Sequence, residues 1–306
     1  MSEAQSIMGG ELGKALKTVK MSAASILDGV GVPMDPLHLD EIPHTMEKMG
    51  WTVSAKMMRR WFATDPAYAM DARIRGGNDV NGNKINYSQL PASQVDDNII
   101  KMSWLMGFPK IRMAAVDLLS RWNNPAAIRR LKGVLMPSVG WKPGMRRALG
   151  NEAWDAKQLD YAAQINSVTV GQYTDDLDDL YGAIFKATLK VAVVGDAYYS
   201  EDHRCDVFAV KKLGLYLRDT YDFNDDIIVD RTVGLGVWSR NRILNKAETV
   251  DYLLATFLRR SVVYHGFVQL RNTDFSRWQK ANGTGGDFFV FSDVLWVNPV
   301  ERFVRL

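Results

Sequence analysis

Cysteine is almost absent from this sequence, which has a single one, Cys205, among 306 residues. That excludes a disulfide within the chain and any zinc site that needs several cysteines. Cys205 lies in the stretch HRCDVF, two positions after His203. On a strand this spacing puts both side chains on one face, and we interpret Cys205 as a small buried residue rather than a nucleophile.

Long apolar runs and a strong charge excess are also missing. No stretch of about 18 apolar residues occurs, so we expect no integral membrane segment. The formal net charge is only +3, from 38 Lys+Arg against 35 Asp+Glu, and so small a bias does not indicate a nucleic-acid partner. The N-terminus lacks the basic start and apolar core of a secretory signal, so we expect a protein that is made in the cytosol. Export without a cleaved signal stays open.

What remains is the composition of a globular protein, with 47% hydrophobic and 24% charged residues, which argues against disorder. Residues 1–40 are weakly patterned and are broken by GVGVPMDP, which predicts an N-terminal arm or leader segment. Residues 41–160 read as a helical region and residues 161–306 as a β-rich region. The last two could form one compact unit.

The helical region has clear periodicity. In IPHTMEKMGWTVSAKMMRRWFA, apolar residues recur at three- and four-residue steps, which predicts a helix over 43–62 with a methionine-rich core face. Pro43 fits its first turn. The stretches PKIRMAAVDLLSRW and PAAIRRLKGVLM each begin with proline and predict two more helices. Between them and the first helix, a small hairpin around Asn81-Gly82 is expected.

After residue 164 the pattern changes to alternation. INSVTV, KATLKVAVVG, KKLGLYLRD, VVYHGFVQL and DFFVFSDVLWV are rich in β-branched and aromatic residues and predict strands. Several are apolar on both faces and should be covered on both sides. Helices are expected in NKAETVDYLLATFLRR and TDFSRWQKANG. We therefore predict an α+β fold, with an N-terminal helical layer followed by a mostly antiparallel, twisted β-sheet covered by helices.

Two polar stretches have plain structural interpretations. TDDLDDL at 174–180 holds four carboxylates without the turn glycine of a calcium loop, so we interpret it as the flank of a short helix. ANGTGGDFFVFSD at 281–293 has no P-loop lysine and precedes a strand. It is either a glycine turn entering that strand or a flexible backbone that leaves room for a ligand near Asp287.

The stretch RDTYDFND at 218–225 is the densest set of ionisable groups. At the end of a strand, Asp219, Tyr221 and Asp222, with the later Arg231, would suit hydrolysis of a phosphoester or pyrophosphate bond. Asp219 and Asp222 could share a divalent cation such as Mg²⁺, and Arg231 could bind phosphate. The alternative is a polar turn, because aspartate and asparagine favour turns.

The chain resembles an uncharacterised bacterial family of unknown function over roughly residues 40–300. The resemblance rests on IPHTMEKMGWTVSAKMMRRWF, KKLGLYLRDTYDFND, GLGVWS and DFSRW followed by GTGGDFFVFSDV. Members of that family occur near type VI secretion genes. This implies an effector or an accessory of bacterial antagonism that is loaded from the cytoplasm, with a secretion spike or adaptor protein, and a cognate immunity protein, as partners.

A second, local resemblance is to colicin M-type bacteriocins, which cleave the pyrophosphate of lipid II. Their motif is Asp-x-Tyr-Asp, a short gap and His-Arg. Asp219, Tyr221 and Asp222 match its first part, but the gap to Arg231 is longer and Asp230 stands where the histidine is expected. His203 or His265 would have to supply the proton-transfer group.

Three functions therefore compete. The first is an antibacterial effector that hydrolyses a phosphorylated envelope precursor in the target cell. The second is a non-enzymatic adaptor, structural or protein-binding component, in which the methionine-rich helix and the nine tryptophans serve as interface anchors. The third is an immunity protein.

Overall fold

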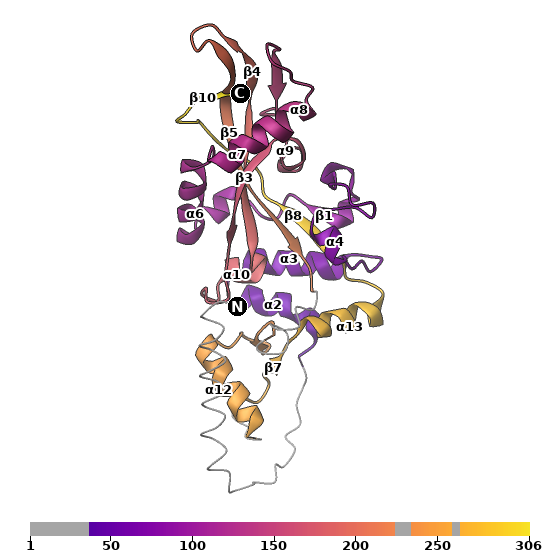
Figure 1. Ribbon diagram of the computed structural model, residues 1–306. Helices are drawn as coiled ribbons and strands as arrows, with labels where there is room; N and C mark the ends of the chain where they lie inside the picture. The colour runs from indigo at the N-terminus through magenta and orange to yellow at the C-terminus, as the bar shows by residue number, and fades with distance from the viewer. Residues whose placement is uncertain (1–36, 224–233, 259–263) are drawn as a thin grey trace.

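A long hairpin of two strands forms the centre of the molecule (Figure 1). The computed structural model describes residues 37–223, 234–258 and 264–306. Within it, β4 (Ala187–Ser200) and β5 (Cys205–Tyr221) pair along almost their whole lengths, with helices packed around them. The arm predicted for residues 1–40 lies almost entirely outside the described residues.

The main sheet has eight strands within the described residues, in the order β1-β8-β5-β4-β2. β9 and β10 also pair with β5, and β3 pairs with β4. The strands around the hairpin are β1 (Val95–Asp96), β2 (Arg147–Leu149), β3 (Gln164–Val170), β8 (Phe288–Phe291), β9 (Leu295–Val297) and β10 (Phe303–Arg305). The described pairs are antiparallel except β1 with β8, which is parallel. The predicted α+β fold is confirmed, and its sheet is mixed rather than purely antiparallel.

The predicted helix over 43–62 is two helices, α2 (Ile42–Lys48) and α3 (Thr52–Ala63). Gly50, at φ 80°, turns the chain between them, and the amide of Trp51 donates to the carbonyl oxygen of Met46 (2.8 Å). A glycine in the left-handed conformation ends helices in this way. Met46 and Met57 are buried, so this methionine face belongs to the core and is not a surface for partners.

Further helices and short turns cover the sheet. In chain order they are η1 (Leu39–Glu41), α4 (Ala72–Arg75), η2 (Tyr87–Gln89), η3 (Ala92–Gln94), α5 (Met102–Leu105), α6 (Pro109–Ser120), α7 (Pro125–Arg130), η4 (Leu131–Leu135), α8 (Met136–Ser138), α9 (Ala156–Ala162) and α10 (Asp179–Ile184). The predicted helices that begin at Pro109 and Pro125 are confirmed. The hairpin around Gly82 is present as a bridge between Asn78 and Lys84.

The C-terminal part adds a small two-stranded sheet and two helices. These elements are β6 (Val237–Trp238), α12 (Lys246–Phe257), β7 (Val268–Gln269) and α13 (Asn272–Asn282). α12, β7 and α13 lie at the opposite end of the hairpin from its turn (Figure 1). The strand predicted in VVYHGFVQL is reduced to β7 among the described residues, and DFFVFSDVLWV divides into β8 and β9.

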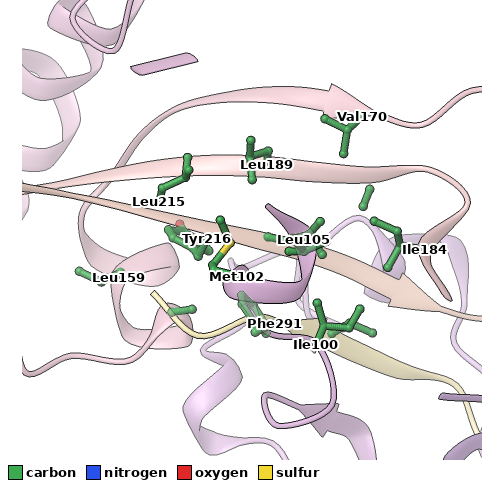
Figure 2. Close-up of a cluster of buried hydrophobic side chains, with 14 of the residues drawn as sticks. Ile100, Met102, Leu105, Leu159, Val170, Ile184, Leu189, Leu215, Tyr216 and Phe291 are labelled. Atoms are coloured by element: carbon green, nitrogen blue, oxygen red, sulfur yellow. The ribbon is translucent and has the colours of Figure 1, made fainter. Parts of the chain in front are cut away.

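The hydrophobic core is continuous from the helices to the hairpin. Leu189 and Leu215 of the hairpin, with Phe291 of β8 and Leu105 of α5, are fully buried in it (Figure 2). The expectation that the strands are covered on both faces is met in the hairpin, where Leu215, Tyr216 and Leu217 are all buried in succession.

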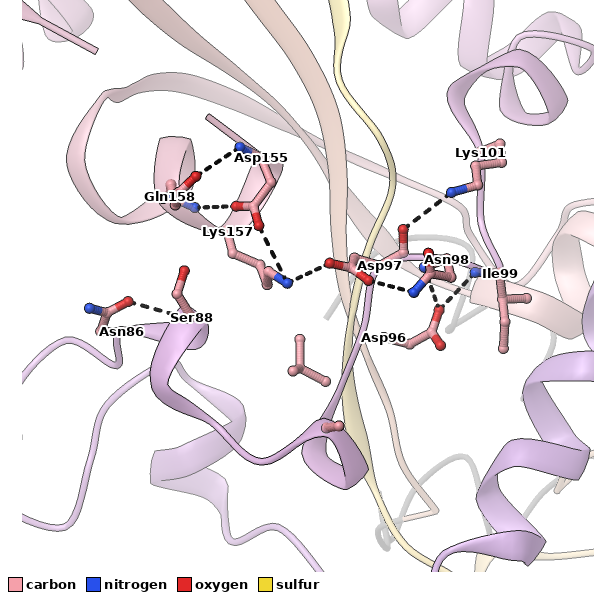
Figure 3. A network of polar contacts seen from close by, with 12 residues as sticks. Asn86, Ser88, Asp96, Asp97, Asn98, Ile99, Lys101, Asp155, Lys157 and Gln158 are labelled. Carbon is pink, nitrogen blue, oxygen red and sulfur yellow. Dashed lines mark hydrogen bonds and ion pairs between the residues drawn. The ribbon is translucent and has the colours of Figure 1, made fainter. Parts of the chain in front are cut away.

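A polar network connects β1 to α9 (Figure 3). The Lys157 ammonium lies between the carboxylates of Asp97 and Asp155, 3.4 Å from the latter. Asp155 in turn begins α9 through a capping box with Gln158. This network fixes the short β1 strand against a helix that comes about sixty residues later.

Candidate functional site

The charged stretch RDTYDFND begins inside β5 rather than after it. Arg218 to Tyr221 pair with β8, and Asp222 and Phe223 follow the strand. The predicted turn therefore starts later than expected, because β8 extends the ladder to Tyr221. Arg231 lies outside the described residues.

Arg218 contacts the opposite face of the sheet from Asp219. Its Nη2 donates to the carbonyl oxygen of Arg75 (3.1 Å) and to the hydroxyl oxygen of Tyr87 (3.0 Å). Its guanidinium also lies over the rings of Tyr87 and Phe289. Through these hydrogen bonds and cation–π contacts, Arg218 holds the segment around η2 against the sheet.

Asp219 and Asp222 are the two carboxylates of the motif that the structure brings together. Burial raises the pKa of the Asp219 carboxyl well above its usual range, and the negative charge of Asp222 adds to the rise. Asp222 has 14% of its side chain exposed and lies 3.6 Å from Nη1 of Arg75. A protonated carboxyl beside an ionised one is a pair that can serve acid–base chemistry.

Tyr221 acts as a packing anchor between other rings. It is 8% exposed, and its ring stacks on Phe288 with centroids 5.3 Å apart. It meets Phe223 edge-on, and Phe223 stacks on Phe275 and meets the edge of Trp61. Burial also raises the pKa of the Tyr221 hydroxyl, so the phenol keeps its proton.

No third ligand joins the two aspartates within the described residues. There, no group of three or more His, Cys, Asp or Glu is arranged to hold a metal ion. A cation shared by Asp219 and Asp222 therefore stays a prediction. The histidines considered as proton donors lie elsewhere, His203 in the turn between β4 and β5 and His265 beside a surface hollow.

Asp287 ties β8 to α3 and to the segment before α4. It is 3% exposed, and its carboxylate accepts from the indole nitrogen of Trp61 (3.0 Å) and the amide of Met70 (2.9 Å). Its own amide donates to the carbonyl oxygen of Tyr68 (2.8 Å). These contacts join segments more than 200 positions apart in the sequence.

The glycines before Asp287 allow α3 to approach the backbone closely. A Cβ on Gly285, which has φ 93°, would lie 2.9 Å from the Trp61 ring. A Cβ on Gly286 would lie 2.3 Å from Cγ2 of Thr64. The protein's own side chains therefore occupy the space in which a ligand was one alternative.

Two of the four carboxylates of TDDLDDL, those of Asp178 and Asp179, cap helices. Asp179 accepts from the amides of Val53 (3.1 Å) and Ser54 (2.8 Å) at the start of α3. Asp178 accepts from the amide of Tyr181 (2.8 Å) and begins α10. The interpretation as the flank of a short helix agrees with these contacts.

The sequence did not predict a buried charged cluster around Asp160. Asp160, 1% exposed, accepts from Nζ of Lys190 (2.6 Å) and from the hydroxyl of Tyr216 (3.0 Å). Lys190 and Tyr216 are direct neighbours on β4 and β5. The sequence signal for this cluster is Lys190, a lysine inside an otherwise apolar strand. No local pattern indicates that its partner lies on α9.

Lys84 extends this cluster to the backbone. Although much of the side chain is exposed, its Nζ donates to the carbonyl oxygens of Asp160 and Tyr161 at the end of α9. Burial of the ammonium lowers the pKa of Lys84 to about 8, against the attraction of Asp160. A lysine on the last carbonyls of a helix is a C-cap, which is a structural role.

A surface hollow of about 400 Å³ lies away from the motif. It is lined by Leu37, Ser239, Arg240, Asn241, Arg242, His265, Gly266 and Phe267. Its two arginines already face carboxylates, Arg240 that of Glu41 and Arg242 that of Glu248. None of Asp219, Tyr221 and Asp222 lines it.

The comparison with known families gives one match, over residues 37–304, to a family of unknown function (DUF6402). The chain belongs to this family. The resemblance to an uncharacterised family is thereby confirmed, over slightly more of the chain than expected. The comparisons with curated proteins and with solved structures gave no match.

Within residues 37–223, 234–258 and 264–306, no helix combines the length and the apolar character that crossing a bilayer requires.

Proposed function

We propose that this protein works by binding a protein partner, as a non-enzymatic adaptor or structural component of a secretion system. The observation that carries the proposal is the position of Tyr221, whose ring is packed between Phe288 and Phe223. A tyrosine that orients a substrate needs a hydroxyl open to that substrate. Here the side chain contributes to the aromatic core instead.

The other motif residues have structural partners as well. Arg218 holds the Tyr87 segment, and Asp222 lies beside Arg75. Asp287, the further candidate, accepts from the Trp61 indole. Each contact joins distant segments, so removing any of these side chains should act first on folding.

Exposed apolar side chains offer the contact surface that a binding protein requires. Met113 and Val116 of α6 are each 67% exposed. Tyr199 near the hairpin turn and Phe303 of β10 are each about half exposed. Aromatic and methionine side chains of this kind are typical of protein interfaces.

The resemblance to proteins encoded near type VI secretion genes supports the choice of a secretion system. The partner would then be a spike or adaptor protein. In this proposal the chain is made in the bacterial cytoplasm and leaves with its partner, without a cleaved signal peptide.

One observation favours a second candidate, the hydrolase. Asp219, with its raised pKa, lies close to Asp222 and the guanidinium of Arg75. This set could transfer a proton and bind phosphate, with or without Mg²⁺, in an effector that attacks a lipid II-type precursor. A cognate immunity protein would then be its second partner.

Growth of a bacterial host separates the two candidates. The protein is produced in the cytoplasm and, with an added signal, in the periplasm, each beside Asp222→Asn at equal folded level. A binding component gives no growth defect that depends on Asp222. Periplasmic lysis that Asp222→Asn abolishes would establish the hydrolase and overturn the proposal.

A further inference from the structure

The strand β10 lies at an edge of the main sheet, near the turn end of the hairpin (Figure 1). Among the described residues it pairs with β5 alone. The carbonyl oxygen of Arg302 accepts from the amide of Val210 (2.8 Å), and the amide of Leu306 donates to the carbonyl oxygen of Asp206 (2.9 Å). Because hydrogen-bonded pairs alternate in an antiparallel ladder, the backbone groups of Phe303 point away from β5.

The outward backbone groups of β10 are open to a further strand. Arg305, two positions after Phe303, has the same backbone orientation. Within the part of the chain that the structure describes, the outward N–H and C=O groups of these two residues form no hydrogen bond with another segment. A row of unpaired backbone groups of this kind can pair with a strand from another chain.

Three exposed side chains follow this edge at two-residue steps: the acid Glu301, the aromatic Phe303 and the base Arg305. Phe303 is 48% exposed, and the ring of His203 packs beside it, with centroids 5.3 Å apart. The chain bends at Glu301, whose carboxylate accepts from the side-chain amide of Asn123. Glu301 and Arg305 form no ion pair with another described residue, so both charges are available to a partner.

The charges around the edge are balanced rather than of one sign. The exposed charged residues there are the acids Glu201, Asp202 and Glu301 and the bases Arg204, Arg302 and Arg305. A balanced edge does not select a partner of one charge. Its acid and base instead lie on either side of Phe303. A two-fold interface, which uses the same surface on both subunits, makes such an arrangement complementary to itself.

A second copy of the chain can bring these opposite charges together. If the two β10 strands pair antiparallel with Phe303 opposite Phe303, Glu301 of each copy lies across from Arg305 of the other. The two aromatic rings form the central cross-strand pair, and aromatic pairs and opposite charges both stabilise such a pairing. A pairing centred on Glu301 or on Arg305 would set like charges against each other, which is destabilising.

We propose that two copies of this protein associate edge to edge through β10, as an antiparallel strand pair centred on Phe303. The main sheet then continues from one copy into the other. Because β10 has only three residues, the dimer is weak and forms at high protein concentration. This inference goes beyond the proposed function and does not rest on it. It assigns Phe303 to self-association and leaves Met113 and Val116 of α6 to the partner protein.

Charge reversal tests the pairing, because two variants that each lose the dimer should regain it when they are mixed. Arg305→Glu leaves two acids along the edge of every copy, and Glu301→Arg leaves two bases. Sedimentation velocity over about 5–500 µM protein measures the dissociation constant of the dimer. Near-UV circular dichroism establishes that each variant is folded. Arg129→Glu, an exposed charge reversal on α7, is the matched control.

We expect the parent protein to dimerise as its concentration rises, and each single variant to weaken the dimer about tenfold or more. The equimolar mixture of Arg305→Glu with Glu301→Arg should dimerise, because every acid then lies across from a base. The double variant Glu301→Arg/Arg305→Glu should dimerise for the same reason, and Arg129→Glu should match the parent. Phe303→Pro removes an outward N–H but no bond to β5, so it should weaken the dimer more than Phe303→Ala does.

A parent protein that stays monomeric to the highest concentration would overturn the proposal. A dimer that persists in each single charge variant, or that their mixture does not restore, would also overturn it, since the contact would then lie elsewhere. If Glu301→Arg does not fold because the contact with Asn123 is lost, a dimer equally strong in Phe303→Pro and Phe303→Ala would have the same consequence. These results leave the proposed function untouched, because that function is tested by the dependence of growth on Asp222.

Discussion

Replacing Asp287 by alanine tests whether this acid is part of the folding scaffold. The change leaves the Trp61 indole N–H and the Met70 amide without their buried acceptor. Each unsatisfied donor costs about 1–3 kcal/mol, so we expect a loss of about 2–6 kcal/mol in the free energy of unfolding. For 306 residues the entropy of unfolding is about 0.6 kcal/mol/K, which gives a melting temperature lower by about 3–9 °C.

Near-UV circular dichroism during heating measures this shift. Asp287→Asn keeps the shape of the side chain but only one acceptor oxygen, so it should cause a smaller loss. Asp202→Ala, an exposed aspartate in the hairpin turn, should stay within about 1 °C of the parent protein. A melting temperature of Asp287→Ala as close as that to the parent would refute the structural role of Asp287.

Three further changes test other parts of the fold. Gly286→Ala should lower the melting temperature, because its Cβ would lie 2.3 Å from Cγ2 of Thr64, and Thr64→Ser in the same chain should restore part of the loss. Asp179→Ala should cost about 1–2 kcal/mol by uncapping α3, whereas exposed Asp176→Ala from the same acidic run should not, as urea unfolding would show. The pKa of Lys84 is about 8 in the folded protein, against an ordinary 10.5. Between these two pH values the unfolded chain keeps the proton that the folded chain releases. The contribution of Lys84 to the free energy of unfolding therefore rises with pH. Urea unfolding at about pH 7 and about pH 9.5 should therefore show the parent gaining stability relative to Lys84→Met, and no change in their difference would contradict this.

The sequence predicted those helices and strands whose signals lie in a few neighbouring residues. Proline at the first turn marked the helices at Pro109 and Pro125, and alternation marked β4 and β5. By the same alternation Tyr216 and Arg218 share one face of β5, where they contact Asp160 and Tyr87. These signals lie within a few residues of the structure that they predict.

The remaining features depend on partners far away in the sequence. β1 has two residues and no pattern of its own, so its parallel pairing with β8 had no local signal. The break between α2 and α3 at Gly50 was not predicted, because the helical spacing of apolar residues continues on both sides of it. The acceptor role of Asp287 toward Trp61 spans 226 positions, so composition and spacing near Asp287 left its role open.

The most direct test concerns Asp222 in the natural setting. The proposed function places the protein in a type VI secretion system, so a strain that carries Asp222→Asn in place of the parent protein is compared with the parent strain for killing of a competitor, at equal folded level. A binding component, in which Asp222 lies beside Arg75 without reacting, predicts killing equal to that of the parent strain. Loss of killing by folded Asp222→Asn, to the level of a strain lacking the protein, would contradict it and establish chemistry at RDTYDFND.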